Sequence, residues 1–226
     1  MDKQWLIIFD MDGTLYDLSD VMDVVYETQI SFLQERMGWT RTEVIQFFRD
    51  NNIEPQVSQK SKSATELFNR LGFGRQEWTE YRQKCFPVEK INPLKAVKAD
   101  LLERFARLGD IVLLTSNTTL VCERILERIG ITPLTFRKIV CSDTESVEMP
   151  FNKFFEMKKL MESGSCKALL SIGDRYQTDI VPALELGGSG CLVRNCSSLE
   201  TIYRDMESGH LGNCSEYEFF AKEERR

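Results

Sequence analysis

The chain has 226 residues, of which 42% are hydrophobic and 28% are charged, and its formal net charge is -6. This composition excludes an intrinsically disordered protein, and the length suffices for one large domain or for a core domain with a smaller one. The net negative charge argues against a nucleic-acid partner, because phosphate backbones bind basic surfaces. A small anionic substrate is compatible with it if positive charge is concentrated in one pocket.

No apolar run approaches the roughly 20 residues that cross a bilayer, and residues 1–4 lead into the first apolar segment without a signal-peptide pattern. We therefore expect a cytoplasmic protein that binds no membrane. The seven cysteines are scattered and include no Cys-x-x-Cys pair. We expect reduced, mostly buried thiols, and neither a disulfide framework nor a zinc site.

The first predicted element is a buried strand at residues 6–9, and the next apolar strand candidate follows only at 111–114. From there strands alternate with amphipathic helices. Helices are expected at 118–128, 151–162, 178–185 and 198–206, and strands at 138–140, 168–172 and 190–193. Near-continuous apolar strands alternating with helices indicate an α/β fold with a parallel sheet covered on both faces. The charged tail, residues 209–226, is expected to fray.

The segment between the first two strands is far longer than the dozen or so residues that a crossover needs. It contains helical patterns at 21–37, 41–49, 64–71 and 76–85, a loop at 51–63, and hinges at 16–18 and 88–93. We therefore predict a core domain of residues 1–16 and 92–226 and an inserted helical domain of residues 17–91. The aromatic residues of the inserted domain either line a substrate pocket or, as is more common, form its core. They are Trp39, Phe47, Phe48, Trp78 and Phe86.

Two carboxylates, Asp10 and Asp12, directly follow the first strand in the run Asp10-Met11-Asp12-Gly13-Thr14. Successive side chains of a strand alternate between faces, so residues two apart point the same way. At the carboxyl end of a strand both side chains would reach the crevice where open α/β sheets bind ligands. With a hard cation present, Asp10 can act as a nucleophile while Asp12 carries protons. The alternative is an Asp-rich turn in which Asp12 binds local amides.

Two further polar segments follow strand candidates. Thr115-Ser116-Asn117 offers hydroxyls and amides at a helix start, which are natural anion donors, although these residue types are also preferred N-caps. The run from Gly173 to Asp179 places Asp174 directly after an apolar strand. Asp174 would face Asp10 only if their two strands are neighbours, and the carboxylates would then suit Mg²⁺.

These three segments resemble the first, second and fourth motifs of the haloacid dehalogenase-like (HAD) superfamily, and the resemblance extends over nearly the whole chain. It implies a Rossmann-like HAD core with a helical cap inserted after the first motif, and a magnesium-dependent phosphatase. In that reading Asp10 is the nucleophile and Asp12 the general acid and base. The Asp10 and Asp174 carboxylates and the Asp12 main-chain carbonyl would hold Mg²⁺, with Asp179 in support. The implied substrate contacts are Thr14, Ser116, Asn117 and Arg175.

The third motif departs from the family pattern. Relatives usually carry a lysine before a proline, and its ammonium bridges the nucleophile and the phosphate, whereas this chain has Met149 before Pro150. Lys153 lies four residues on, which is one helical turn later on the same face, and its flexible stem could deliver the charge. Arg175 is a weaker substitute. If neither does so, the site is catalytically impaired.

The function expected from the sequence is hydrolysis of a small phosphomonoester of the sugar phosphate, nucleotide or phosphoglycolate type, by a monomer or homodimer. Dehalogenases of the superfamily lack the second carboxylate of the first motif, which Asp12 supplies here. A sugar phosphomutase uses a cap histidine, whereas the single histidine, His210, lies in the tail. A phosphonate hydrolase would need a cap lysine that forms a Schiff base, and no lysine of the predicted cap is singled out by an apolar neighbourhood. A weakened, phosphate-binding HAD protein is the alternative that Met149 suggests.

Overall fold

The computed structural model describes residues 5–53, 64–143, 151–164, 168–212 and 214–221. The chain forms two compact units, which we call unit 1 (Met1–Leu18 with Asn92–Arg226) and unit 2 (Ser19–Ile91). Among the helices in these described ranges, none combines the length and hydrophobicity that a bilayer span requires.

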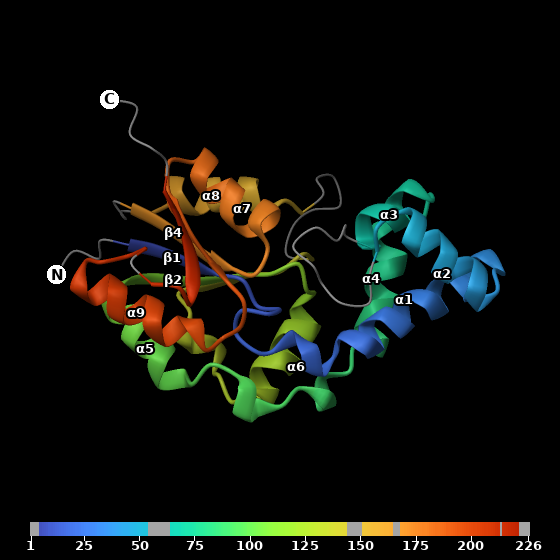
Figure 1. Ribbon diagram of the computed structural model, residues 1–226, viewed down its shortest axis with the longest axis horizontal. Helices are drawn as coiled ribbons and strands as arrows, with labels where there is room; N and C mark the ends of the chain where they lie inside the picture. Colours follow the sequence, from blue (N-terminus) through green and yellow to red (C-terminus); the bar gives the residue numbers. More distant parts are fainter. Residues whose placement is uncertain (1–4, 54–63, 144–150, 165–167, 213, 222–226) are drawn as a thin grey trace. The chain divides into compact units, whose positions relative to one another are not determined.

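Unit 1 is built on a six-stranded sheet in the order β3-β2-β1-β4-β5-β6 (Figure 1). The strands are β1 (Trp5–Phe9), β2 (Gly109–Leu114), β3 (Lys138–Val140), β4 (Ala168–Gly173), β5 (Ser189–Val193) and β6 (Tyr217–Ala221). All neighbouring pairs are parallel except β5 and β6. The predicted α/β fold with a parallel sheet is therefore confirmed. Because β1 lies between β2 and β4, the three strand ends that carry the sequence motifs are adjacent.

Helices cover both faces of this sheet (Figure 1). They are α5 (Ala99–Leu108), α6 (Thr119–Arg128), α7 (Lys153–Glu162), α8 (Val181–Glu185) and α9 (Ser198–Ser208). Alternate residues of β1 serve opposite faces: Leu6 and Ile8 pack in one cluster with Met157 of α7. Phe9 meets Phe105 of α5 on the other face, with ring centroids 5.1 Å apart. Two-sided burial explains why the strands read as continuous apolar runs.

The structure corrects the sequence prediction at three places in unit 1. Helix α5 was not anticipated. Residues 217–221, expected to fray, form β6, which pairs antiparallel with β5. The helix expected from residue 178 starts instead as a π-helical turn, Tyr176–Ile180, before α8 begins at Val181. A π turn inserts an extra residue into the helix and is frequent at functional sites.

Unit 2 is a small helical unit with its own aromatic core. Its helices are α1 (Met22–Met37), α2 (Arg41–Asp50), α3 (Ala64–Arg70) and α4 (Arg75–Cys85). Thr40 and Glu43 form a capping box that starts α2. Phe32 is fully buried, and the Phe68 and Trp78 rings lie 5.1 Å from its ring. Phe48 and Trp78 belong to this core, against which Trp39 and Phe47 pack, so these four residues hold unit 2 together; Phe86 is buried as well.

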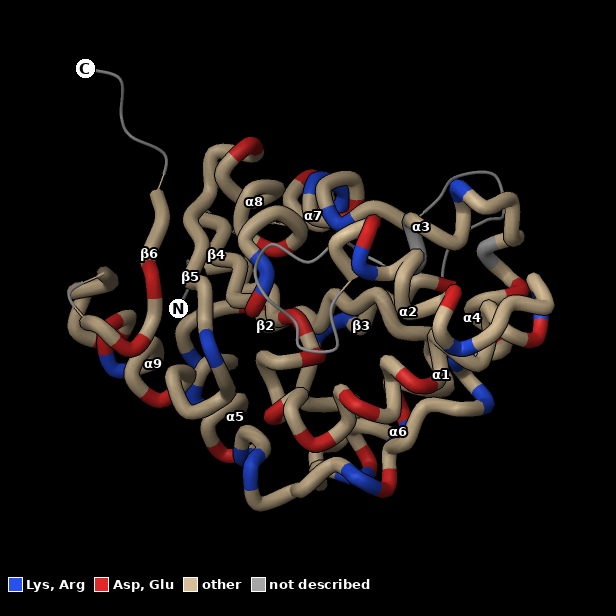
Figure 2. The backbone as a smooth tube through the Cα atoms, turned by 45° about the vertical axis from the view of Figure 1, so that its right-hand side comes forward, with Lys and Arg blue, Asp and Glu red and all other residues tan. Residues whose placement is uncertain are grey.

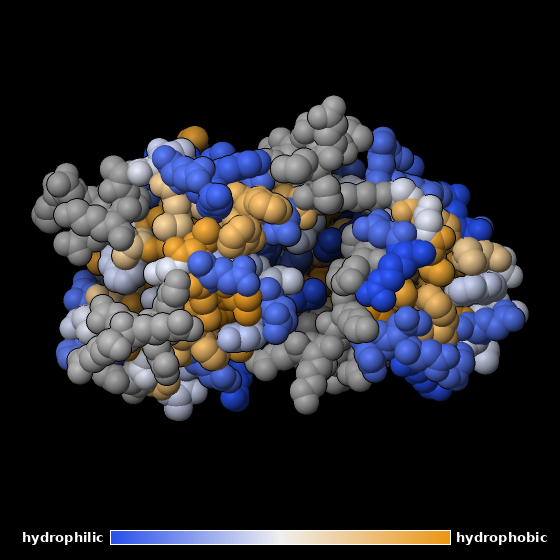
Figure 3. All heavy atoms as spheres, turned by 90° about the horizontal axis from the view of Figure 1, so that it is seen from above, coloured by the Kyte–Doolittle hydropathy of each residue, from blue (hydrophilic) through white to orange (hydrophobic). Residues whose placement is uncertain are grey.

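The surfaces of the helices are mixed in character. Both basic and acidic residues lie on the helices of unit 2 (Figure 2), where Arg36 pairs with Glu77 at 2.7 Å. Exposed pairs of this kind contribute little to stability. Figure 3 looks onto the side of unit 1 that carries α7 and α8, where hydrophobic side chains show between hydrophilic ones. Phe155 and Met161 of α7 are among the exposed hydrophobic residues.

Replacement of Leu102 by Ala should lower the free energy of unfolding by about 2–5 kcal/mol, because it removes buried methyl groups and leaves a cavity. Leu102 on α5 is fully buried, whereas Leu134, in a short turn of the same unit, is 92% exposed. Leu134→Ala is therefore the matched control and should change stability by less than about 0.5 kcal/mol. Urea denaturation of both variants measures the difference. Equal losses would contradict the placement of α5 in the core.

Candidate active site

Asp10 directly follows β1, at the carboxyl end of this central strand and next to β4. The Asp10 amide still donates to the Ile172 carbonyl of β4 at 2.9 Å, so its position is fixed by the sheet ladder. Asp10 is 8% exposed. The chain then turns at Gly13, whose φ of +77° lies in the left-handed region that favours glycine. Strand β1 thus ends in a buried carboxylate and a sharp turn.

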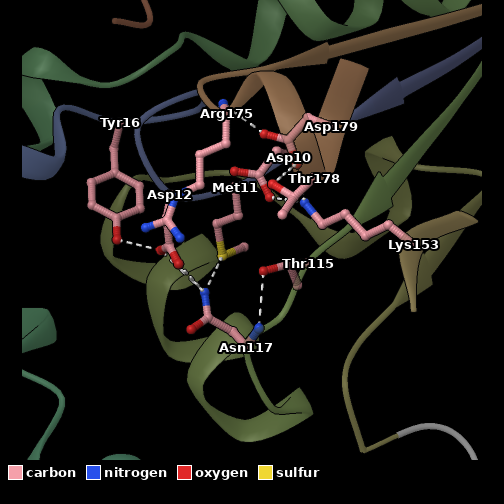
Figure 4. A network of polar contacts seen from close by, with 10 residues as sticks. All are labelled: Asp10, Met11, Asp12, Tyr16, Thr115, Asn117, Lys153, Arg175, Thr178 and Asp179. Atoms are coloured by element: carbon pink, nitrogen blue, oxygen red, sulfur yellow. Dashed lines mark hydrogen bonds and ion pairs between the residues drawn. The ribbon is translucent and has the colours of Figure 1, made fainter. Parts of the chain in front are cut away.

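Lys153 brings a buried ammonium to Asp10 from a distant part of the chain. Its Nζ lies 2.5 Å from Asp10 Oδ1 and 2.7 Å from Asp179 Oδ1, and all three residues are buried (Figure 4). Asn152 caps α7 by accepting from the Phe154 amide, so Lys153 is the first residue of the helix. Helix α7 therefore begins at Lys153 and not at residue 151 as expected. The predicted spacing of one helical turn between Met149 and Lys153 stays a prediction, because Met149 lies outside the described residues.

The π-helical turn after β4 aims Asp179 at this ammonium. The Asp179 Oδ2 atom accepts a hydrogen bond from the Arg175 amide at 2.9 Å, and Oδ1 accepts one from the Thr178 hydroxyl at 3.2 Å. Asp179 is 2% exposed. Its carboxylate therefore closes the turn with one oxygen and holds Lys153 with the other.

Three carboxylates converge at the ends of β1 and β4: oxygens of Asp10, Asp174 and Asp179 lie within 4.8 Å of one another. Two glycines leave room for them. A Cβ on Gly13 would stand 2.6 Å from Asp174 Oδ2, and one on Gly173 would stand 2.4 Å from Asp179 Oδ2. Both distances are shorter than side chains tolerate, so the carboxylates occupy space that only glycine leaves.

The cluster carries more negative than positive charge. Burial, followed by the charges of Asp179 and Asp12, raises the pKa of Asp10 to about 7, although Lys153 acts in the opposite direction. Burial and the charges of Asp10 and Asp179 raise the pKa of Asp174 to about 8. Burial alone would lower the pKa of Lys153, but the attraction of Asp10 and Asp179 outweighs it and the pKa is raised. Lys153 therefore stays an ammonium.

The donor set fits a divalent cation such as Mg²⁺. When all three carboxylates are ionised, they and the one ammonium leave two uncompensated negative charges, which a divalent ion would balance. Asp174 accepts no hydrogen bond from any residue in the described part of the chain, so its oxygens have no competing donor there. The Asp12 carboxylate is not part of this cluster.

Asp12 points instead to a separate pair of hydrogen-bond donors. The Tyr16 hydroxyl donates to Asp12 Oδ1 at 2.6 Å. The Asn117 amide nitrogen lies 3.1 Å from Oδ1 and 3.0 Å from Oδ2 (Figure 4). Sequence reasoning placed Tyr16 in a hinge and missed this contact. A tyrosine four residues after the carboxylate was a possible signal, because a turn at Gly13 folds the chain back.

The other predicted substrate contacts differ in their surroundings. The Thr14 hydroxyl is buried and lacks a hydrogen-bond partner among the described residues. The Thr115 hydroxyl accepts from the Asn117 amide at 3.1 Å, and Ser116 is exposed. Arg175 is half-buried beside the acidic cluster. The structure thus joins Asp10, Lys153, Asp174 and Asp179 in one group and Asp12 with Asn117 in another, and it leaves Ser116 at the surface. His210 is exposed, as a bystander would be.

The sequence from residue 7 to residue 192 matches the family model of haloacid dehalogenase-like hydrolases. The chain belongs to this family. No curated protein matches the chain significantly.

Solved HAD structures share the fold at low sequence identity. A haloacid dehalogenase-like family hydrolase from Xanthomonas campestris is 16% identical with a TM-score of 0.54, over 92% of this chain and 94% of the other. The candidate HAD-hydrolase YfnB from Bacillus subtilis, bound to magnesium, is 15% identical with a TM-score of 0.52, over 90% and 100%. A HAD phosphatase from Thermococcus onnurineus is 15% identical with a TM-score of 0.53, over 87% and 96%. Such identities show a common fold and no common substrate.

Replacement of Gly13 by Ala should weaken Mg²⁺ binding at least about tenfold, because the new methyl group would displace the Asp174 carboxylate. Gly130→Ala is the matched control. Gly130 also has a left-handed φ, +73°, but nothing lies within 4 Å of its added Cβ. Both variants therefore carry the backbone strain, and only the first disturbs the cluster. Isothermal titration with Mg²⁺ measures the difference, and equal affinities in the two variants would contradict it.

Mg²⁺ should raise the melting temperature more at about pH 8 than at about pH 6. The pKa values of Asp10 and Asp174 are raised from 3.8 to about 7 and about 8. From pH 3.8 up to these raised values, the metal-free folded protein therefore binds more protons than the unfolded chain. The stability of the metal-free protein therefore falls as the pH rises through that window. Mg²⁺ competes with the protons for the carboxylates, so it restores more of the lost stability at high pH. Thermal denaturation with and without chelator tests this. A pH-independent shift would contradict it, and Asp174→Asn should lose most of the shift.

Proposed function

We propose that the protein is a Mg²⁺-dependent phosphatase that hydrolyses a small phosphomonoester through an aspartyl-phosphate on Asp10. The observation that carries this proposal is the buried Lys153 ammonium, 2.5 Å from Asp10 Oδ1, beside three clustered carboxylates. A nucleophilic carboxylate, a fixed cation next to it and oxygen ligands for a divalent metal are what phosphoryl transfer to an aspartate requires. Family membership is consistent with this hydrolytic chemistry.

The metal ligands in this proposal are the Asp10 and Asp174 carboxylates, with Asp179 in support and the Asp12 main-chain carbonyl as a further oxygen donor. When bound, Mg²⁺ supplies positive charge that offsets the charges of the phosphate and the carboxylates. Lys153 adds a second positive charge whose position is fixed by two ion pairs. Fixed charges of this kind stabilise a developing negative charge without reorganisation during the reaction.

In the first step Asp10 attacks the phosphorus and the bond from phosphorus to the leaving oxygen breaks, while Asp12 gives its proton to that oxygen. In the second step water attacks the phosphorus of the aspartyl-phosphate and Asp12 takes the proton from the water. The bond between phosphorus and the Asp10 oxygen then breaks and releases inorganic phosphate. Proton transfer by a positioned carboxyl group contributes roughly 10²- to 10⁴-fold in rate.

Unit 2 and four polar residues complete the proposal. We assign unit 2 as the cap that shields the reaction from water, because it is helical and is inserted directly after the first motif. Thr14 and Arg175 are proposed to contact the phosphate, with Ser116 at the rim. Asn117 already binds the Asp12 carboxylate, so its proposed contribution acts through that residue.

Lys153→Ala should lower kcat/KM for an aryl phosphate by about 10²- to 10³-fold, the loss typical of a removed charge-stabilising group. Lys158→Ala on the same helix is the matched control, because the Lys158 side chain is 54% exposed and pairs with Glu162 at 3.9 Å. It should change activity less than about twofold. Asp10→Asn should abolish Mg²⁺-dependent turnover. Steady-state assays with magnesium and with chelator measure all three variants.

Normal turnover by Lys153→Ala, or full activity in chelator, would contradict the proposed function. The weakened, phosphate-binding alternative makes a different prediction. In that case the wild type is inert with Mg²⁺, and Met149→Lys alone confers Mg²⁺-dependent hydrolysis.

A further inference from the structure

The hydrogen bonds to Asp12 come from two elements that meet at one carboxylate. Tyr16 reaches it from the turn that follows β1, and Asn117 reaches it from the segment between β2 and α6. The Tyr16 contact is short, at 2.6 Å. Neither donor is part of the three-carboxylate cluster.

The main chain fixes Tyr16 from both directions. Tyr16 forms isolated bridges with Asp12 and with Ala96, and its side chain is fully buried. Flanking hydrogen bonds run from the Asp17 amide to the Lys95 carbonyl at 3.1 Å and from the Val97 amide to the Leu15 carbonyl at 2.8 Å. The phenol ring therefore has little freedom, and its hydroxyl holds the Asp12 side chain in one place.

Asn117 is held with comparable firmness. It is buried, and its main-chain amide donates to the Thr115 hydroxyl at 3.1 Å. Its side-chain nitrogen reaches both Asp12 oxygens, and the nearby Met11 sulfur lies 3.6 Å away. Its side-chain oxygen, Oδ1, is buried without a hydrogen-bond partner among the described residues. Burial of an oxygen without a hydrogen-bond partner is unfavourable, so the two contacts to Asp12 are made at an energetic cost.

We propose that Tyr16 is a positioning residue for the reaction: together with Asn117 it orients the Asp12 carboxylate for proton transfer. This inference rests on the proposed phosphatase function. Tyr16 acts through Asp12 and touches no reacting atom. A carboxylate held by donors from two elements does not have to be ordered again in each catalytic cycle, which is the advantage of a preorganised group.

The test is Tyr16→Phe, which removes the hydroxyl and keeps the ring. Tyr203→Phe is the matched control, since Tyr203 is also buried in unit 1 and donates to the Glu207 carboxylate at 2.9 Å. We expect Tyr16→Phe to lower kcat roughly 10- to 100-fold, the size of a hydrogen bond to a charged group, at nearly constant KM. Tyr203→Phe should leave kcat unchanged. A wild-type kcat in Tyr16→Phe would overturn the proposal.

A double-mutant cycle separates positioning from a general structural effect. In an Asp12→Asn background, Tyr16→Phe should cause no further loss of kcat, because the group that it positions is already gone. The same fold loss in both backgrounds would overturn the proposal. The residual activity of Asp12→Asn can be followed with an aryl phosphate whose leaving group needs no proton.

Crystal structures of wild type and Tyr16→Phe decide the proposal even if the wild type hydrolyses no phosphate. In that event the proposed function fails, whereas the positioning role still predicts that the Asp12 side chain leaves its Asn117-facing orientation in the variant. An Asp12 conformer that is unchanged in Tyr16→Phe would overturn the positioning role itself.

Discussion

The ion pair between the buried Lys153 ammonium and Asp10 is the interaction on which the rest of the site depends. Burial of an ammonium is unfavourable unless carboxylates surround it, and Asp10 and Asp179 do so at 2.5 and 2.7 Å. The same carboxylates, with Asp174, would repel one another without positive charge nearby. A fixed ammonium and a divalent cation together would balance this cluster.

The fold supplies this arrangement by simple means. Strand β1 lies between β2 and β4, so residues more than a hundred positions apart in the sequence meet where these parallel strands end. Asn152 starts α7 at Lys153, which directs that side chain to the end of β1. The π-helical turn before α8 directs Asp179 to the same point, and Gly13 and Gly173 leave the necessary space.

Much of this could be predicted from local patterns. Apolar runs located β1, β2, β4 and β5, and the motif positions at their ends anticipated the cluster around Asp10. The missed features depend on tertiary context. Strand β6 lies in a tail rich in charged residues and is partly exposed, and it pairs with β5. The bond from Tyr16 to Asp12 depends on how the turn at Gly13 folds back, and the reach of Lys153 depends on where α7 begins. Residue types and spacing alone do not encode these distances.

Identification of the residue that becomes phosphorylated tests the proposed role of Asp10. The protein is mixed with a phosphomonoester and Mg²⁺, quenched with acid during turnover and reduced with borohydride, and its peptides are then mapped by mass spectrometry. If Asp10 is the nucleophile, Asp10 alone is converted to homoserine and Asp10→Asn shows no conversion. Turnover that leaves Asp10 unmodified, or conversion of a different aspartate, would contradict it.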